Sequence, residues 1–241
     1  MKKMKFAVIV AALVAIVSMS SCLGNSESTV QTQAYYVTVI QDAVYGYKFL
    51  MDDGTILVPN ESLSSYASKL GSQKRVLLYF KLAENVNNPS QKQYSISFEG
   101  FYPVETKRVI DLCDNKLAAD TLAKENCNIN SWSLYSAYKG YITIIPSFYY
   151  GKYLPYFDLA YNSEEVKDNK ITFTAYFDAR TRDTYSTVSN TYSFIFPEDV
   201  YSKITGDSLE IEVKAHTTDG ISINPLKTKI SANDLLPYYG Y

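Results

Sequence analysis

The residues that most often carry acid-base or nucleophilic chemistry are sparse in this chain. His216 is the single histidine among 241 residues. Histidine is the commonest general base, so its scarcity removes most triad-type arrangements. The sequence also has no Gly-x-Ser-x-Gly elbow, no His-Glu-x-x-His segment and no phosphate-binding loop. We therefore predict that the protein is not an enzyme, and a hydrolase is the weakest of the alternatives we keep.

Pairs of adjacent carboxylates are the other candidates for catalysis: Asp52/Asp53, Glu164/Glu165 and Glu198/Asp199. Each pair has a structural explanation. The first precedes a glycine in a predicted hairpin turn, and the second lies in a polar loop. The third follows a proline where the N-terminus of a helix favours negative charge. The sequence therefore predicts no catalytic residue.

Cys22 has the sequence context of a lipid attachment site. Three lysines lie within residues 1–5, residues 6–17 are an unbroken apolar run of twelve, and small residues precede the cysteine. This order is typical of a secretory signal peptide, and the run is shorter than the roughly 20 residues of a membrane-spanning helix. Ser20-Ser21-Cys22 resembles a lipobox, although Met19 stands where Leu, Val or Ile is usual. We predict acylation of Cys22 rather than ordinary secretion with a free cysteine left over.

Lipidation at Cys22 would hold the mature protein on a membrane without crossing it. Leu23 follows the cysteine where an Asp would favour the inner membrane, so the resemblance points to the outer membrane. Residues 24–33 are polar and are predicted to form a flexible tether. Without residues 1–21 the chain keeps 20 basic and 25 acidic residues, a formal charge of −5. The absence of overall basic character argues against a nucleic-acid partner.

Cys113 and Cys127 are the two cysteines outside the signal region, fourteen positions apart. In an extracytoplasmic protein we expect a disulfide between them, worth roughly 3 kcal/mol for a loop of that size. The alternative is two free thiols that behave as small hydrophobic residues. One histidine and two such cysteines are too few for a structural zinc site, so we predict no metal and no cofactor.

Tyrosine is the one strongly enriched residue type, with 23 copies. Tyr149, Tyr150, Tyr153 and Tyr156 surround a Gly-Lys loop, and three more tyrosines end the chain. Exposed rings of this kind could stack on a sugar or anchor a protein partner. The alternative is that the rings pack at sheet edges while their hydroxyls reach water.

The elements that would position these residues are strands. Residues 35–40, 45–51 and 55–58 alternate with period two around an Asp-Gly turn, residues 60–71 have helical spacing, and residues 76–82 and 94–98 resume the strand pattern. Asn60 is a candidate N-cap, and Gly71 a candidate left-handed C′ residue. The order β-β-β-α-β-β is that of the OB-fold, a five-stranded closed barrel.

The second half predicts about seven strands, near residues 132–134, 141–148, 153–161, 171–177, 192–196, 209–215 and 227–230, with a helical turn within 197–206. Polar and apolar residues alternate along them, which favours an antiparallel β-sandwich over a parallel sheet. The fold class is therefore all-β. The predicted segments are a signal peptide (1–21), a tether (22–33), an OB-like domain (34–108), a junction (109–131) and a sandwich domain (132–241).

The signal region, the hairpin Tyr-Gly-Tyr-Lys-Phe-Leu-Met-Asp-Asp-Gly-Thr-Ile-Leu-Val-Pro-Asn and the strand Gln-Lys-Arg-Val-Leu-Leu-Tyr-Phe-Lys-Leu resemble the NigD-like family of bacterial lipoproteins. The family name comes from an operon linked to bacteriocin production. The resemblance implies an OB-type domain followed by a β-sandwich, and it supplies no activity. The segment His216-Thr217-Thr218 is similar to a His-Asn-containing segment in relatives, but Thr217 replaces the Asn, so no role is assigned to His216.

These observations favour a non-enzymatic lipoprotein that acts as an interaction module in the cell envelope. Its expected partners are the membrane, through the lipid anchor, and a protein or glycan of the envelope. A carbohydrate-binding accessory lipoprotein is the main alternative, because OB barrels accept oligosaccharides on one face.

Overall fold

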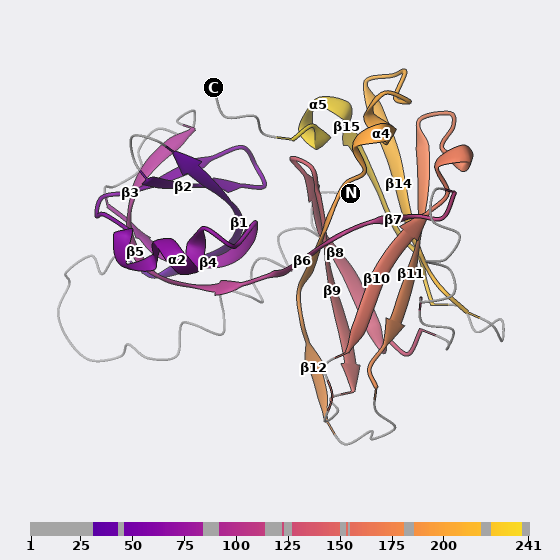
Figure 1. Cartoon of the computed structure of the whole chain (residues 1–241), viewed down its shortest axis with the longest axis horizontal. Helices are drawn as coiled ribbons and strands as arrows, with labels where there is room; N and C mark the ends of the chain where they lie inside the picture. The colour runs from indigo at the N-terminus through magenta and orange to yellow at the C-terminus, as the bar shows by residue number, and fades with distance from the viewer. Residues whose placement is uncertain are drawn as a thin grey trace, which may run out of the picture. The chain divides into compact units, whose positions relative to one another are not determined.

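The computed structural model describes residues 31–42, 46–83, 92–113, 122, 127–149, 153, 155–180, 186–217 and 223–237 (Figure 1). Residues 32–241 form one compact unit, within which a barrel precedes a sandwich. Cys22 and the predicted signal peptide lie outside the described residues. Among the residues described, no helix is long and apolar enough to span a membrane.

The first part is a closed five-stranded barrel, as the sequence predicts (Figure 1). Its strands are β1 (Gln33–Asp42), β2 (Gly46–Met51), β3 (Ile56–Pro59), β4 (Arg75–Leu82) and β5 (Gln93–Pro103). They pair in the order β1-β2-β3-β5-β4, and β4 returns to β1. The β3–β5 pair is parallel and the other four are antiparallel. This is the order of an OB-type barrel, in which closure removes exposed strand edges.

Strand alternation fills the barrel from inside. The inward residues Val37, Phe49, Leu78, Phe80 and Ile96 are at most 1% exposed. Alternate positions of the same strands point outward, because successive side chains of a strand lie on opposite faces.

The predicted helix is present but shorter than expected. A 3-10 turn η1 (Ser64–Tyr66) leads into the helix α2 (Ala67–Leu70). Leu63 and Leu70 are buried in the barrel core, as their spacing indicates. The predicted caps are wrong: the helix has no side-chain N-cap, and Gly71 has a right-handed φ of −62°. Gly71 is small for another reason, since a Cβ there would lie 2.9 Å from the carbonyl oxygen of Ala67.

The second part is a sandwich of two sheets. One sheet contains, in order, β15 (Leu226–Ser231), β14 (Ser208–Ala215), β11 (Lys170–Asp178), β10 (Tyr156–Tyr161) and β7 (Ile110–Asp111). The other contains β12 (Thr187–Ser189), β9 (Tyr141–Tyr149), β13 (Tyr192–Ile195) and β6 (Glu105–Arg108), with β8 (Ser131–Tyr138) also pairing with β9. Three short helical segments accompany them: η2 (Ser163–Glu165), α4 (Glu198–Tyr201) and α5 (Ala232–Leu235).

The predicted β-sandwich is present, but the prediction that it is antiparallel is only partly right, because its two sheets are mixed. Strands β11 and β14 run parallel, as do β6 with β13 and β7 with β10. The chain leaves β11 for β12 and β13 in the other sheet before it returns as β14. Alternation of polar and apolar residues indicates only which face of a sheet is exposed to solvent, so it does not predict whether neighbouring strands run parallel or antiparallel.

The barrel and sandwich boundaries also differ from the sequence analysis. The predicted barrel domain extends to residue 108, but residues 105–108 form β6, which pairs with β13 in the sandwich. Residues 110–111 were assigned to the junction, but β7 pairs with β10 in the other sheet. Only Val104 separates β5 of the barrel from β6 of the sandwich. One nearly continuous extended segment therefore belongs to the barrel and to both sheets.

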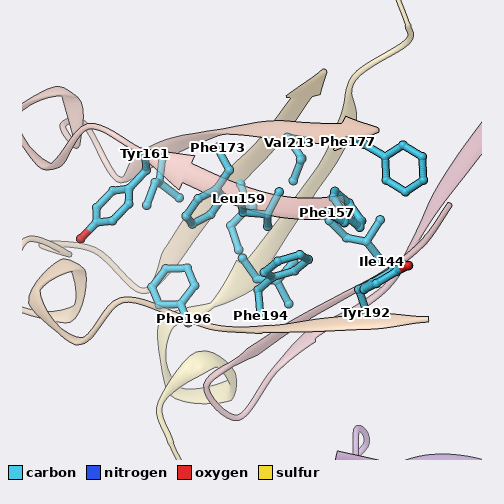
Figure 2. Close-up of a cluster of buried hydrophobic side chains, with 14 of the residues drawn as sticks. Ile144, Phe157, Leu159, Tyr161, Phe173, Phe177, Tyr192, Phe194, Phe196 and Val213 are labelled. Atoms are coloured by element: carbon cyan, nitrogen blue, oxygen red, sulfur yellow. The ribbon is translucent and has the colours of Figure 1, made fainter. Parts of the chain in front are cut away.

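Aromatic residues from both sheets fill the space between them (Figure 2). Phe157, Phe173, Phe177 and Phe194 are all completely buried. Phe157 meets its neighbours edge to face, with ring centroids 5.0 to 5.3 Å apart. Such pairs stabilise a core beyond the area that they bury.

Glu212 organises a charge network on the outer face of β14. Its side chain is almost fully buried beneath three lysines: Lys170, Lys214 and Lys227. The hydrogen bond from Lys227, 2.8 Å long, and the hydrogen bond from Lys214, together with the charges of both lysines, hold the pKa of Glu212 below its ordinary value of 4.5, against the opposing effect of burial. The folded state therefore favours the ionised carboxylate.

We expect this network to stabilise the fold above about pH 4.5 and to lose its effect as the pH falls through the folded-state pKa of Glu212. Glu212→Gln should lower the urea midpoint at pH 7 and have a smaller effect at pH 3. Lys227→Met, which removes the main partner, should show the same trend. An equal effect of Glu212→Gln at both pH values would contradict the assignment.

Candidate functional site

The most concentrated polar chemistry in the described residues surrounds Arg75. Its side chain lies on β4 and points out of the barrel, yet it is completely buried. An arginine is almost never fully buried without partners. The side chain makes two charged hydrogen bonds to Asp52, from Nη1 to Oδ1 (2.6 Å) and from Nη2 to Oδ2 (2.8 Å). This bidentate geometry is the strongest form of an arginine-carboxylate pair.

Hydroxyl groups from both parts of the protein complete this group, which we call the Arg75 cluster: Arg75, Asp52, Thr38, Ser136, Thr143 and Ser193. Arg75 donates to Thr38 Oγ1 of the barrel (3.1 Å) and to Thr143 Oγ1 of the sandwich (3.3 Å). Ser136 of β8 donates to Asp52. Thr143 and Ser193 share a buried hydrogen bond of 2.7 Å. The cluster therefore ties the barrel to the sheet of β8, β9 and β13.

Tyrosine rings lie around the Arg75 cluster. The guanidinium carbon lies 5.3 Å from the ring centroid of Tyr141, close enough for a cation-π contact. Tyr36 of the barrel meets Tyr135 of the sandwich edge to face at 4.7 Å and hydrogen-bonds Thr191. Burial, with a smaller contribution from the charge of Asp52, raises the pKa of Tyr135 to about 12. Its phenol therefore stays neutral at physiological pH.

This geometry is suited to holding two parts of a fold together rather than to catalysis. Both oxygens of Asp52 and both terminal nitrogens of Arg75 are already engaged by protein groups. A catalytic acid or base must reach the proton of a substrate. Arg75 Nε is buried without a hydrogen-bond partner among the described residues, but Arg75 offers no exposed surface to a ligand.

The carboxylate pairs considered in the sequence have structural roles. Asp53 accepts from the backbone nitrogen of Thr55 in the predicted hairpin turn. Asp199, in the first turn of α4, accepts from the hydroxyl of Tyr161. Glu164 and Glu165 form η2. Asp52 was explained as a turn residue only, and that explanation was incomplete, because its main partner is the distant Arg75.

His216 lies at the end of β14. Its ring stacks on Tyr176, with centroids 4.7 Å apart. Its backbone nitrogen bonds the carbonyl of Ala175, and its own carbonyl accepts from Cys127. The described contacts of His216 are therefore ring packing and backbone pairing.

The expected disulfide between Cys113 and Cys127 is absent, so that prediction is wrong. Both cysteines are free thiols. The Cys113 thiol donates to Asn162 Oδ1, whereas Cys127 lies in the sandwich core. The two cysteines have separate partners, and sequence spacing alone could not show that their Cα atoms fail to meet. Among the described residues, no group of three or more metal-ligating side chains is present.

Burial raises the pKa of the Cys127 thiol to about 12, so almost no reactive thiolate forms at pH 8. We expect iodoacetamide to leave Cys127 unmodified in the folded protein and to modify it in guanidinium without reductant. Peptide mass spectrometry would measure both states. Failure to label either cysteine after denaturation, reversed by a reductant, would show a disulfide instead.

The predicted aromatic surface at residues 149–156 is only partly described. Tyr150 lies outside the described residues. Tyr149 is half-buried at the end of β9, and Tyr156 is half-buried, with Lys107 5.6 Å from its ring centroid. Tyr153 is the exposed member, at 62%. Of the three described rings only that of Tyr153 is exposed, so Tyr153 stays the candidate contact residue.

A shallow polar hollow of about 410 Å³ lies where the end of β5 meets β6. Its lining residues are Ser72, Gln73, Lys74, Pro103, Val104, Glu105, Thr106 and Asn190. No local sequence pattern predicts this hollow, because its residues come from three separate segments. Amide and hydroxyl groups of this kind can hydrogen-bond a hydroxylated ligand.

Solved structures with the same fold are found among proteins of Parabacteroides and Bacteroides species. A chain from Parabacteroides merdae, described as uncharacterized, matches with a TM-score of 0.58 and 15% identity over 83% of this chain and 99% of its own. A NigD-like immunity protein from Bacteroides caccae matches with a TM-score of 0.53 and 15% identity, over 82% of this chain and 92% of its own. A Bacteroides fragilis protein, provisionally described as a lipoprotein, matches with a TM-score of 0.56 and 12% identity, over 84% of this chain and 98% of its own.

No family model matches the sequence, and no curated protein matches it. At these identities the likeness to solved structures shows a shared fold. That fold is the all-β arrangement expected from the sequence.

Proposed function

We propose that the protein is a NigD-like, non-enzymatic lipoprotein of the outer membrane, anchored through Cys22, whose barrel and sandwich form one rigid interaction module. The Arg75 cluster carries this proposal. The most elaborate polar arrangement in the described residues is buried between the barrel and the sandwich, where it binds the two parts to each other.

Two further observations support the anchor and the absence of enzymatic activity. The basic, apolar and small-residue order before Cys22 has the features of a lipoprotein signal. The structural relatives described above are named as a lipoprotein, an immunity protein and an uncharacterized protein, and none of these names denotes an enzyme. The envelope partner would then dock on a surface whose two halves keep a fixed geometry.

The anchor is tested by metabolic labelling with palmitate. The wild-type protein should incorporate the label and partition with the outer-membrane fraction. Cys22→Ala should lose both, because no acyl chain could then be attached. Cys113→Ala is the matched control and should retain both. Unchanged membrane partition of the Cys22→Ala variant would refute the anchor.

Carbohydrate binding is the second candidate, favoured by the polar hollow beside β5 and β6 and by the exposed ring of Tyr153. A glycan array with the acylated protein in detergent would test it. Binding that is lost in Asn190→Ala identifies the hollow, and binding lost in Tyr153→Ala identifies the tyrosine. No signal on the array would remove this candidate.

A further inference from the structure

Four aromatic residues gather at one end of the barrel, and we call them the aromatic rim: Tyr35, Tyr66, Phe98 and Phe101. Strand register places three of them beside the same two residues of β4, and the ring of Tyr35 packs on Phe80 with centroids 6.1 Å apart. Tyr35 of β1 and Phe101 of β5 both lie opposite Leu78 of β4, and Phe98 lies opposite Phe80. Tyr66 of η1 then packs across β5, with its ring centroid 4.9 Å from Phe98 and 6.4 Å from Phe101.

The rim is only partly covered by the rest of the protein. Tyr35 is 38% exposed and Tyr66 is 39% exposed, whereas Phe98 and Phe101 are half-buried against the barrel core. Tyrosine combines an apolar ring with a polar hydroxyl, which suits a boundary between apolar and aqueous surroundings.

The chain enters the barrel at this rim. Thr32, just before β1, donates a 2.7 Å hydrogen bond to the carboxylate of Glu99. Glu99 lies on β5 between Phe98 and Phe101. The ten residues from Cys22 to Thr32 span at most about 35 Å when fully extended. An acyl chain on Cys22 would therefore keep the rim within that distance of a membrane.

The charges nearest the rim are balanced. Glu99 pairs with Lys81 at 2.5 Å. Glu61 accepts a 2.7 Å hydrogen bond from the backbone nitrogen of Phe98, and Lys69 lies in the last turn of α2. These two acidic and two basic side chains, which belong to the described part of the chain, balance in charge and leave no net charge among them to repel a bilayer surface. This neutrality fits a zwitterionic headgroup layer better than a strongly charged partner.

We propose that the aromatic rim contacts the headgroup layer of the bilayer that holds the acylated Cys22. Tyrosine is enriched at this depth in membranes because its ring and hydroxyl can meet both environments. Because the tether keeps the rim close to the membrane, the effective concentration of lipid around the rim is high. Even weak contacts between the rim and the headgroups would then form for much of the time. This inference rests on the proposed anchor, and it additionally fixes which end of the barrel faces the membrane.

The test uses the full acylated protein in phosphatidylcholine vesicles. Cys113→Ser and Cys127→Ala remove the competing thiols, and Ser65→Cys, an exposed position in η1, carries an environment-sensitive dye. Vesicle flotation first establishes anchoring, so its failure would count against the proposed function alone. In floated samples, phospholipid with a nitroxide near the headgroup should quench the dye by about twofold.

Tyr35→Ser/Tyr66→Ser should abolish most of this quenching while flotation persists. Tyr102→Ser/Tyr153→Ser is the matched control, because these rings are more exposed, at 67% and 62%, but lie outside the rim. That control should remain quenched. Ser62→Glu adds a carboxylate at an exposed position just before η1 and gives up only the 3.4 Å hydrogen bond from the backbone nitrogen of Ser64. It should reduce quenching even if the tyrosine pair proves unstable.

Two outcomes would overturn the inference. One is an unquenched dye on floated wild-type protein. The other is quenching that neither the tyrosine pair nor Ser62→Glu changes. Protection of the dye in native envelopes but not in vesicles would assign the rim to a protein partner and would likewise reject membrane contact.

Discussion

Arg75→Met is expected to lower the free energy of unfolding by about 3–5 kcal/mol, because it leaves the largely buried Asp52 carboxylate without its cation. The substitution keeps an unbranched side chain of comparable length, so the loss would report mainly on charge and hydrogen bonding. Equilibrium unfolding in urea, followed by circular dichroism, measures it.

The surface pair Lys81–Glu99 provides the control for Arg75. Lys81 is 41% exposed on the same strand, β4, so Lys81→Met should cost less than about 1 kcal/mol. Arg75→Met combined with Asp52→Leu should cost less than the sum of the two single changes, since neither charge is then buried alone. A change below 1 kcal/mol for Arg75→Met would show that the cluster does not hold the barrel and sandwich together.

Phe157→Ala is expected to destabilise the sandwich by about 3–5 kcal/mol, because it removes a fully buried ring and leaves a cavity. Phe157 contacts the rings of Phe177, Tyr192 and Phe194 edge to face, so several pairs are lost at once. Figure 2 shows Phe157 among these residues between the two sheets. Urea unfolding again measures the loss.

Phe157→Leu keeps most of the apolar volume and should cost clearly less than Phe157→Ala. Tyr153→Ala removes a ring that is 62% exposed and should change the free energy of unfolding by no more than about 0.5 kcal/mol. Similar losses for Phe157→Ala and Tyr153→Ala would contradict the described core.

Local patterns in the sequence were enough to predict the strands and the helix of the barrel. Alternation around Asp52-Asp53-Gly54 predicts the β2–β3 hairpin, and helical spacing places Leu63 and Leu70 in the core. The closed barrel of five strands followed from the order of these elements. Such predictions work because side-chain period and turn chemistry are properties of a few neighbouring residues.

The candidate site was less accessible to sequence reasoning. The Asp-Asp-Gly turn by itself accounts for an aspartate at position 52. Arg75 is, in the sequence, one charged residue at the start of a strand. Their pairing spans 23 positions, and the contact of Arg75 with Thr143 spans 68. The one available signal was the placement of both residues in the two segments that resemble the NigD-like family.

By itself, the sequence determined the all-β class, the strand positions and the candidate acylation site, because strand periodicity and the order of a signal peptide are local. Only the tertiary structure decided that Arg75 is buried against the sandwich, that β11 and β14 run parallel and that Cys113 and Cys127 stay apart. These features depend on which distant segments meet, and the free energy of such contacts is set by packing across the whole fold rather than by the pattern within any one segment.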